Sequence, residues 1–255
     1  MRKTPIVLAI TIALSAASPL AADDHDSDES LKLAIHHVKV KMGHGMAFRA
    51  GMEAYSACLA ENDYDESYSV WHAVDGDRTG YHIVSSFKLW GEFDEDDDAS
   101  SECWQKEGMR EGVFDHLSSW ETQYAERLTA WSGDMEDSNV VKLHNFRVDD
   151  NSDFRSVVSE ITTHLKEADY EHIGTWYDML SGGYWGADYF VVEQFENFAA
   201  MDEDRKGYNG VLTEVLGEDR TGRVWDAFRE ALEDDKGYWT FMLERRASMG
   251  YSADD

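Results

Sequence analysis

Hydrophobic and polar residues alternate along two segments that lie about one hundred residues apart. Residues 33–40 read Leu-Ala-Ile-His-His-Val-Lys-Val, and residues 141–148 read Val-Lys-Leu-His-Asn-Phe-Arg-Val. A period of two predicts a half-buried strand in each place. Each segment is followed by apolar residues spaced i, i+4, i+7 and i+11, which form one face of an amphipathic helix. These residues are Phe48, Met52, Tyr55 and Leu59 in the first case and Phe154, Val158, Ile161 and Leu165 in the second.

The similarity continues through a predicted hairpin, which indicates an internal repeat. The first strands match at an offset of 108 residues, pairing His36 with His144, and the helices match at 106. In the hairpin, Trp71 is matched with Trp176 at an offset of 105, and a glycine-containing turn follows each. The second copy ends with a helical pattern and a strand at 238–245. In the first copy, the equivalent stretch fits either a strand or a continued helix.

Each copy therefore has the order β-α-β-β-α-β. This order predicts an α+β fold made of two tandem ferredoxin-like units, each with a mainly antiparallel four-stranded sheet. We assign residues 31–135 to the first repeat and residues 136–250 to the second. Because the helices cover one face of each sheet, the other face must be buried against another element.

This pattern resembles the dimeric α+β barrel superfamily of ferredoxin-like domains. The resemblance covers about residues 31–250 and rests on the histidine-containing first strand, the amphipathic helix and the aromatic hairpin. It implies that the two sheets pack face to face as one intramolecular barrel, so the protein would be a monomer containing a pseudo-dimer. The superfamily includes cofactor-independent monooxygenases, haem-binding enzymes and proteins with no known reaction. The resemblance therefore implies a place for a ligand, between sheet and helices or within the barrel, rather than a reaction.

The N-terminus carries a targeting pattern. A positively charged start is followed by an apolar run at residues 6–17 and by small residues, so residues 1–22 are predicted to be a signal peptide. The apolar run is too short to span a membrane. Residues 23–30 contain no apolar residue and are predicted to be an acidic, disordered leader. We expect the mature protein to be periplasmic or secreted.

The composition excludes some partners. The chain has 52 acidic and 23 basic residues, and its formal net charge is −29. Such a surface repels phosphate backbones and anionic membrane surfaces, so we expect no nucleic-acid partner. We also expect no membrane span, because the apolar run near the N-terminus is too short. The two cysteines, Cys58 and Cys103, fit one disulfide in an oxidising compartment, with two buried thiols as the alternative.

Histidine and aromatic side chains supply the candidates for a ligand site. Three of the first-copy histidines could converge on one sheet face and serve a metal, haem or acid–base chemistry. Pairing of His72 with His82 would place both on one face, whereas pairing of Val74 with Tyr81 would separate them, and the sequence leaves this register open. Partly buried structural histidines and aromatic core packing are the plainer interpretation. The candidates are His36, His37, Trp71, His72, His82, His144, Trp176 and Tyr177.

These observations lead us to expect a soluble exported protein that binds a small apolar or aromatic molecule. We predict no metal and no cofactor, with haem kept as an alternative. Two other functions stay open: a cofactor-independent or haem-linked oxidoreductase of monooxygenase type, and a protein-interaction module. The sequence contains no glycine-flanked serine elbow, phosphate-binding glycine loop or Cys-x-x-Cys motif, so it identifies no catalytic residue.

Overall fold

The computed structural model describes residues 31–95, 97–135, 137–182 and 186–253, so the predicted signal peptide (residues 1–22) and the whole predicted leader (residues 23–30) lie outside the described residues. The first half contains β1 (Lys32–Val40), α1 (Gly45–Glu61), β2 (Tyr68–Ala73), β3 (Gly80–Phe87), η1 (Trp90–Asp94), α2 (Asp98–Gln105), α3 (Met109–Phe114) and β4 (Leu117–Arg127). The second half contains β5 (Val140–Phe146), α4 (Asn151–Glu167), β6 (Thr175–Ser181), β7 (Tyr189–Phe195), η2 (Phe198–Asp202), α5 (Tyr208–Leu216), α6 (Glu218–Glu230), β8 (Tyr238–Arg245) and η3 (Ala247–Met249).

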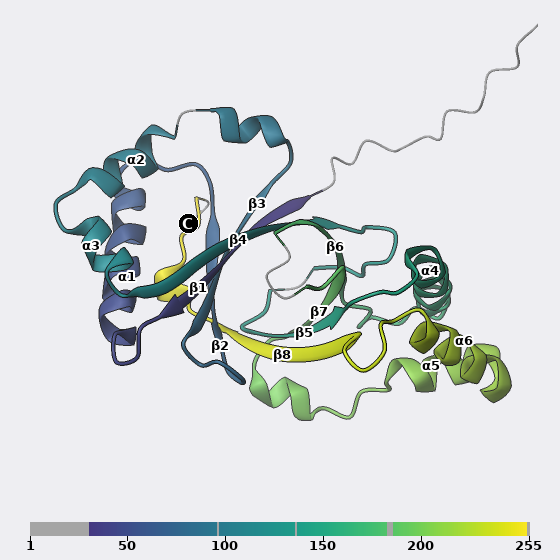
Figure 1. The fold of residues 1–255 in the computed structure, drawn as a ribbon. Helices are drawn as coiled ribbons and strands as arrows, with labels where there is room; N and C mark the ends of the chain where they lie inside the picture. Colours follow the sequence, from purple (N-terminus) through teal and green to yellow (C-terminus); the bar gives the residue numbers. More distant parts are fainter. Residues whose placement is uncertain (1–30, 96, 136, 183–185, 254–255) are drawn as a thin grey trace, which may run out of the picture.

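Within the described residues, eight strands form one closed barrel in the order β1-β3-β2-β8-β5-β7-β6-β4. Each half contributes a four-stranded antiparallel sheet, and the pairs β2–β8 and β4–β6 join the two sheets. Figure 1 shows the barrel between two helical layers, with α1–α3 on one side and α4–α6 on the other. The prediction of two tandem ferredoxin-like units closing as an intramolecular α+β barrel is therefore confirmed.

The amphipathic patterns place the long helix of each half as expected. The apolar positions predicted for α1 and for α4 are all buried. In the first layer, α1 approaches α3 so closely that a Cβ atom at Gly51 would lie 2.1 Å from the carbonyl oxygen of Gly112. Only glycine permits this contact.

None of the described helices is long and apolar enough to cross a membrane.

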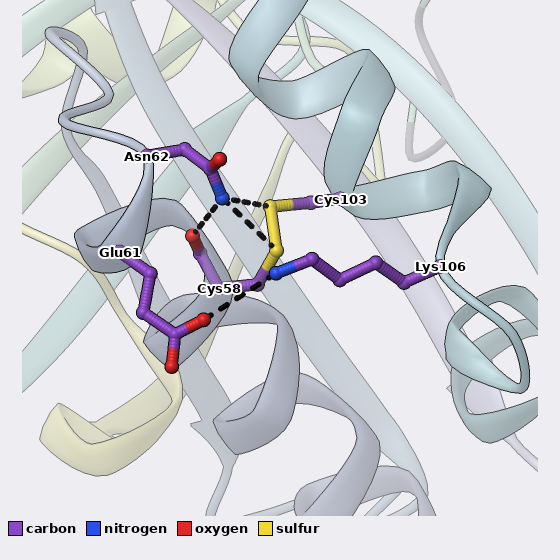
Figure 2. A network of polar contacts seen from close by, with 5 residues as sticks. All are labelled: Cys58, Glu61, Asn62, Cys103 and Lys106. Atoms are coloured by element: carbon purple, nitrogen blue, oxygen red, sulfur yellow. Dashed lines mark hydrogen bonds and ion pairs between the residues drawn. A yellow bond between two sulfur atoms is a disulfide. The ribbon is translucent and has the colours of Figure 1, made fainter.

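A disulfide fastens the first helical layer (Figure 2). Cys58 in α1 and Cys103 in α2 are bonded, with their Cα atoms 5.9 Å apart. The Asn62 side-chain amide donates a hydrogen bond to the Cys58 carbonyl oxygen at 2.7 Å and lies 3.5 Å from each sulfur. Lys106 and Glu61 form an ion pair beside it. Closing a loop of this length contributes about 4 kcal/mol.

The hairpin register corrects the alignment of the two repeats. Trp71 pairs with His82, and Tyr177 pairs with Phe190. His82 and Phe190 are themselves equivalent, because they pair with the matching residues 37 and 145 of the first strands. The counterpart of Trp71 is therefore Tyr177, at an offset of 106, and not Trp176. A slip of one residue moves a side chain to the opposite face of a sheet, so this correction changes which aromatic residues share a cavity.

Candidate functional site

The structure distributes the eight predicted residues over three places. The barrel interior holds four of them: His37, Trp71, His82 and Tyr177. The outer face of the first sheet holds His36 and His72. The outer face of the second sheet, under α4–α6, holds His144 and Trp176.

The structure settles the register that the sequence left open, and the first-copy histidines do not all converge on one sheet face. His72 pairs with Tyr81 rather than with His82, so His72 and His82 lie on opposite faces. His36 and His37 are adjacent in a strand and must also face opposite ways. His37 and His82 meet as a pair inside the barrel, with their Nδ1 atoms 2.8 Å apart. His72 instead contacts the Arg78 carbonyl oxygen and the Arg246 guanidinium.

The cavity between sheet and helices is larger in the second half than in the first. A cavity of about 650 Å³ separates the outer face of β5–β8 from α4–α6 and their connections. Aromatic rings supply much of its wall, and Phe146 stacks on Trp176 with the ring centroids 5.3 Å apart. A concave, mainly apolar space with a few polar groups is typical of a small-molecule site.

Three polar side chains from neighbouring strands meet at this cavity. His144 in β5 has its Nε2 atom 3.2 Å from Glu193 Oε2 in β7 and its Nδ1 atom 2.7 Å from the Tyr238 hydroxyl in β8. The hydrogen bond from His144 holds the pKa of the Glu193 carboxyl below its usual range, although burial opposes this effect. Glu193 is therefore an ionised acceptor, and Nε2 of His144 carries the proton.

This arrangement fixes the role of the remaining imidazole nitrogen. With Nε2 donating to Glu193, the Nδ1 atom of a neutral His144 has a lone pair that accepts a hydrogen bond from the Tyr238 hydroxyl. Burial and the charge of Glu193 raise the pKa of Tyr238, so that phenol stays protonated. Tyr238 is 51% exposed and stands at the edge of the cavity. A ligand hydroxyl could take its place at Nδ1.

Two tryptophans of the cavity wall, Trp176 in β6 and Trp225 in α6, carry buried indole N–H groups that lack an acceptor among the described residues. A buried donor without an acceptor costs free energy of about 1–3 kcal/mol. A ligand carrying a carbonyl oxygen would satisfy such a donor.

The sequence prediction missed Glu193, Tyr238 and Trp225. Glu193 is the one charged residue in the strand Tyr189–Phe195, and this was the available signal. Its contact with His144 follows only from the β5–β7 register, in which His144 pairs with Val191, two residues before Glu193. Tyr238 likewise reaches His144 diagonally, because its direct partner across β5–β8 is Phe146.

The cavity does not present an open ligand for haem iron. Among the described residues, His144 is the histidine that lines it, and both of its ring nitrogens have hydrogen-bond partners. No cluster of three or more His, Cys, Asp or Glu side chains in the described ranges is arranged to hold a metal ion. The described lining of this cavity therefore does not fit haem.

Comparison with known proteins gives matches in structure alone. No protein-family model matches the sequence, and no curated protein matches it. A candidate monooxygenase from Lactobacillus acidophilus NCFM is 9% identical and has a TM-score of 0.52 over 88% of this chain and 97% of its own. An anthrone oxidase-like protein is 12% identical, with a TM-score of 0.50 over 90% and 95%. A chlorite dismutase variant from Candidatus Nitrospira defluvii is 8% identical, with a TM-score of 0.49 over 86% and 92%. At these identities the likeness concerns the fold.

Proposed function

Because the chain has the dimeric α+β barrel fold with both units in one molecule, we propose that its second-half cavity binds a planar aromatic phenol or ketone. We further propose that His144, supported by Glu193, removes a proton from the bound molecule and so makes it reactive toward dioxygen. The observation that carries this proposal is the Glu193–His144–Tyr238 arrangement at the edge of an aromatic cavity of about 650 Å³. This is the monooxygenase-type function, and it includes the binding of a small aromatic molecule.

The walls support the choice of ligand. Stacked aromatic rings such as Phe146 and Trp176 favour a flat, apolar molecule. The indole N–H groups of Trp176 and Trp225 favour a carbonyl oxygen on that molecule. An open cavity with this lining also favours ligand binding over the interaction-module alternative.

The proton transfer is assigned to named atoms. The Nδ1 atom of His144 accepts the proton, and the Glu193 carboxylate stabilises the imidazolium that forms. In anthrone the proton comes from the CH₂ group opposite the carbonyl, and the resulting carbanion is delocalised over the rings. This electron-rich species then reduces dioxygen. Overall the CH₂ group becomes C=O, one dioxygen is consumed and one water is released.

The experiment measures dioxygen uptake with anthrone as the probe. The matched variants are His144→Gln and His36→Gln, because His36 occupies the equivalent position in the first sheet. We expect the mature protein to accelerate uptake above the buffer rate, H144Q to lower that rate by about 100-fold, as is typical for loss of a general base, and H36Q to leave it unchanged. Equal rates for H144Q and the unaltered protein would overturn the proposed base. Tight binding of anthrone without any uptake would reduce the function to ligand binding.

We also propose that the protein is exported, as the N-terminal pattern predicts. The Cys58–Cys103 disulfide supports export, because disulfides persist in oxidising compartments outside the cytoplasm. Mass spectrometry of the protein from its host tests the proposal. We expect the purified protein to begin near residue 23. A protein that still begins at Met1 would contradict cleavage and export.

A further inference from the structure

A second cavity lies inside the barrel and shares no lining residue with the cavity between the second sheet and its helices. Its volume is about 360 Å³, and its lining includes strand ends at one rim of the barrel and the C-terminal residues Tyr251 and Ser252. An eight-stranded barrel is just wide enough either to be filled by its side chains or to hold one small ligand. Here the side chains leave space.

The walls of this barrel cavity are mainly apolar, and a cluster of four polar side chains lies deep inside. Leu33, Val84 and Val192 are among the apolar residues that line it. This polar cluster consists of His37, His82, Gln123 and Asn145, whose exposed fractions are between 1% and 5%. Burying four polar side chains in an apolar core costs free energy unless their hydrogen bonds are used. An apolar body with a single polar end matches this lining.

The histidine pair forms the floor of the barrel cavity. The same two residues also line a cavity of about 300 Å³ at the turn between β2 and β3, beside Asp75 and Asp77. The His37–His82 pair therefore lies between the barrel cavity and this second cavity, which are at opposite ends of the barrel. A molecule that enters from the rim at Tyr251 would meet His37 and His82 at the bottom.

The floor carries donors and acceptors but no charge. Burial lowers the pKa of His37 to about 4, and burial together with His37 lowers the pKa of His82 well below its usual value. With Nδ1 facing Nδ1, one neutral ring carries its proton on Nδ1 and the other on Nε2. Among the described residues of the lining, Arg245 at the mouth is the charged side chain. An anionic group at the floor would therefore lose its hydration without gaining a counter-charge.

We propose that the barrel interior is a second binding site, which takes a small uncharged amphiphile with an alkyl or single-ring body and one hydroxyl or amide group directed at the His37–His82 pair. The site is independent of the proposed oxidation, because it lies on the other face of the second sheet. The two cavities differ in volume as well, with about 360 Å³ in the barrel and about 650 Å³ between the second sheet and its helices.

The test is a calorimetric titration of the mature protein at pH 8 with 1-octanol and, separately, with octanoate. These probes share an apolar chain and differ in the charge of the head group. We expect 1-octanol to bind at least tenfold more tightly than octanoate. Equal or tighter binding of octanoate would overturn the uncharged-ligand assignment and direct attention to Arg245. No binding of either probe would overturn the site.

Two adjacent residues of β7 locate the binding. Val192 lines the barrel cavity and Val191 lines the sheet–helix cavity, so Val192→Phe and Val191→Phe fill one space each. We expect V192F to abolish 1-octanol binding and to keep the binding of 1,8-dihydroxyanthraquinone, a flat aromatic probe, with V191F giving the reverse. Loss of 1-octanol binding in V191F alone would contradict the barrel site. Failure of the aromatic probe in every protein would count against the proposed function and leave the barrel site standing.

A third variant tests the floor. Replacing His37 by Asn and His82 by Phe installs the residues found at the equivalent positions in the second half, Asn145 and Phe190. We expect H37N/H82F to weaken 1-octanol binding at least tenfold. Unchanged affinity in the folded double variant would overturn the role of the pair, and the V192F and V191F results decide the site whether or not this variant folds.

Discussion

The two halves of the barrel share one topology and differ in the space beneath their helices. In the first half this space is about 190 Å³, and Tyr55 stacks on Trp104 within it at a centroid distance of 4.0 Å. In the second half it is about 650 Å³. A disulfide fastens α1 to α2 in the packed half, whereas the open half has no cysteine. The space beneath the helices is therefore small in the first half and large in the second.

The same division extends to the polar residues. His36 and His144 are equivalent, but Ser85 stands where the second half has Glu193, and Trp120 stands where it has Tyr238. Nδ1 of His36 therefore forms a hydrogen bond with the Thr122 hydroxyl, and the His36 ring lies against the Trp120 ring. Equivalent histidines thus have different chemistry because their cross-strand neighbours differ. This is why we place the proposed function in the second half alone.

The largest expected effect comes from removing the disulfide. We predict that Cys58→Ala with Cys103→Ala lowers the free energy of unfolding by about 4 kcal/mol, because the unfolded chain regains the entropy of an open loop. Denaturant unfolding of the double variant beside the unaltered protein measures this loss. Hydrogen exchange should become faster in α1 and α2, with α4–α6 little changed. Equal acceleration in both helical layers would show that the bond does not act on the first half selectively.

The barrel interior gives the next effect, which is a dependence of stability on pH. His37 has a pKa of about 4 in the folded protein against an ordinary value of 6.5, so the unfolded chain binds its proton more readily. Stability is therefore fully present above pH 6.5 and is lost as the pH falls toward 4, by about 3 kcal/mol for this residue.

Replacing the pair by its second-half counterparts isolates this effect from the many carboxylates. We predict that H37N/H82F removes the contribution, so the difference in unfolding free energy between this variant and the unaltered protein changes between pH 7 and pH 4.5. His44→Gln, at an exposed histidine, is the control and should follow the unaltered protein. A constant difference for H37N/H82F across this range would contradict the account.

A smaller effect follows from opening the packed half. Trp104 is half-buried and stacks on Tyr55 beside the first-half cavity. We predict that Trp104→Ala costs about 2 kcal/mol of stability, less than for a fully buried tryptophan. The enlarged space should then bind 1,8-dihydroxyanthraquinone at a second, weaker site, which calorimetry would detect as a stoichiometry above one. A stable variant with unchanged stoichiometry would indicate that more than aromatic packing closes this half.

Residue patterns were sufficient for the order of strands and helices, because period-two strands and amphipathic helices recur in matching order, whereas closure of the barrel was implied by the family resemblance. The strand at 238–245 has the predicted bounds, and the four apolar positions predicted for α4 are buried, although Val157 and Thr162 on the same face were not predicted. The site was harder, because its geometry depends on register. Pairing of Trp71 with His82, and not of His72 with His82, decided which side chains face the barrel. Glu193 and Tyr238 reach His144 across strands that are distant in sequence, and no local pattern encodes that contact.

The claim that the second half alone binds the aromatic ligand is tested most directly by two equivalent substitutions. Ile83 and Val191 occupy the same position in the two sheets and line the first-half and second-half cavities, respectively. The measurement is the affinity of 1,8-dihydroxyanthraquinone for Ile83→Phe, Val191→Phe and the unaltered protein. We predict at least a tenfold loss for V191F and no change for I83F. A loss confined to I83F, or none in either variant, would contradict the assignment.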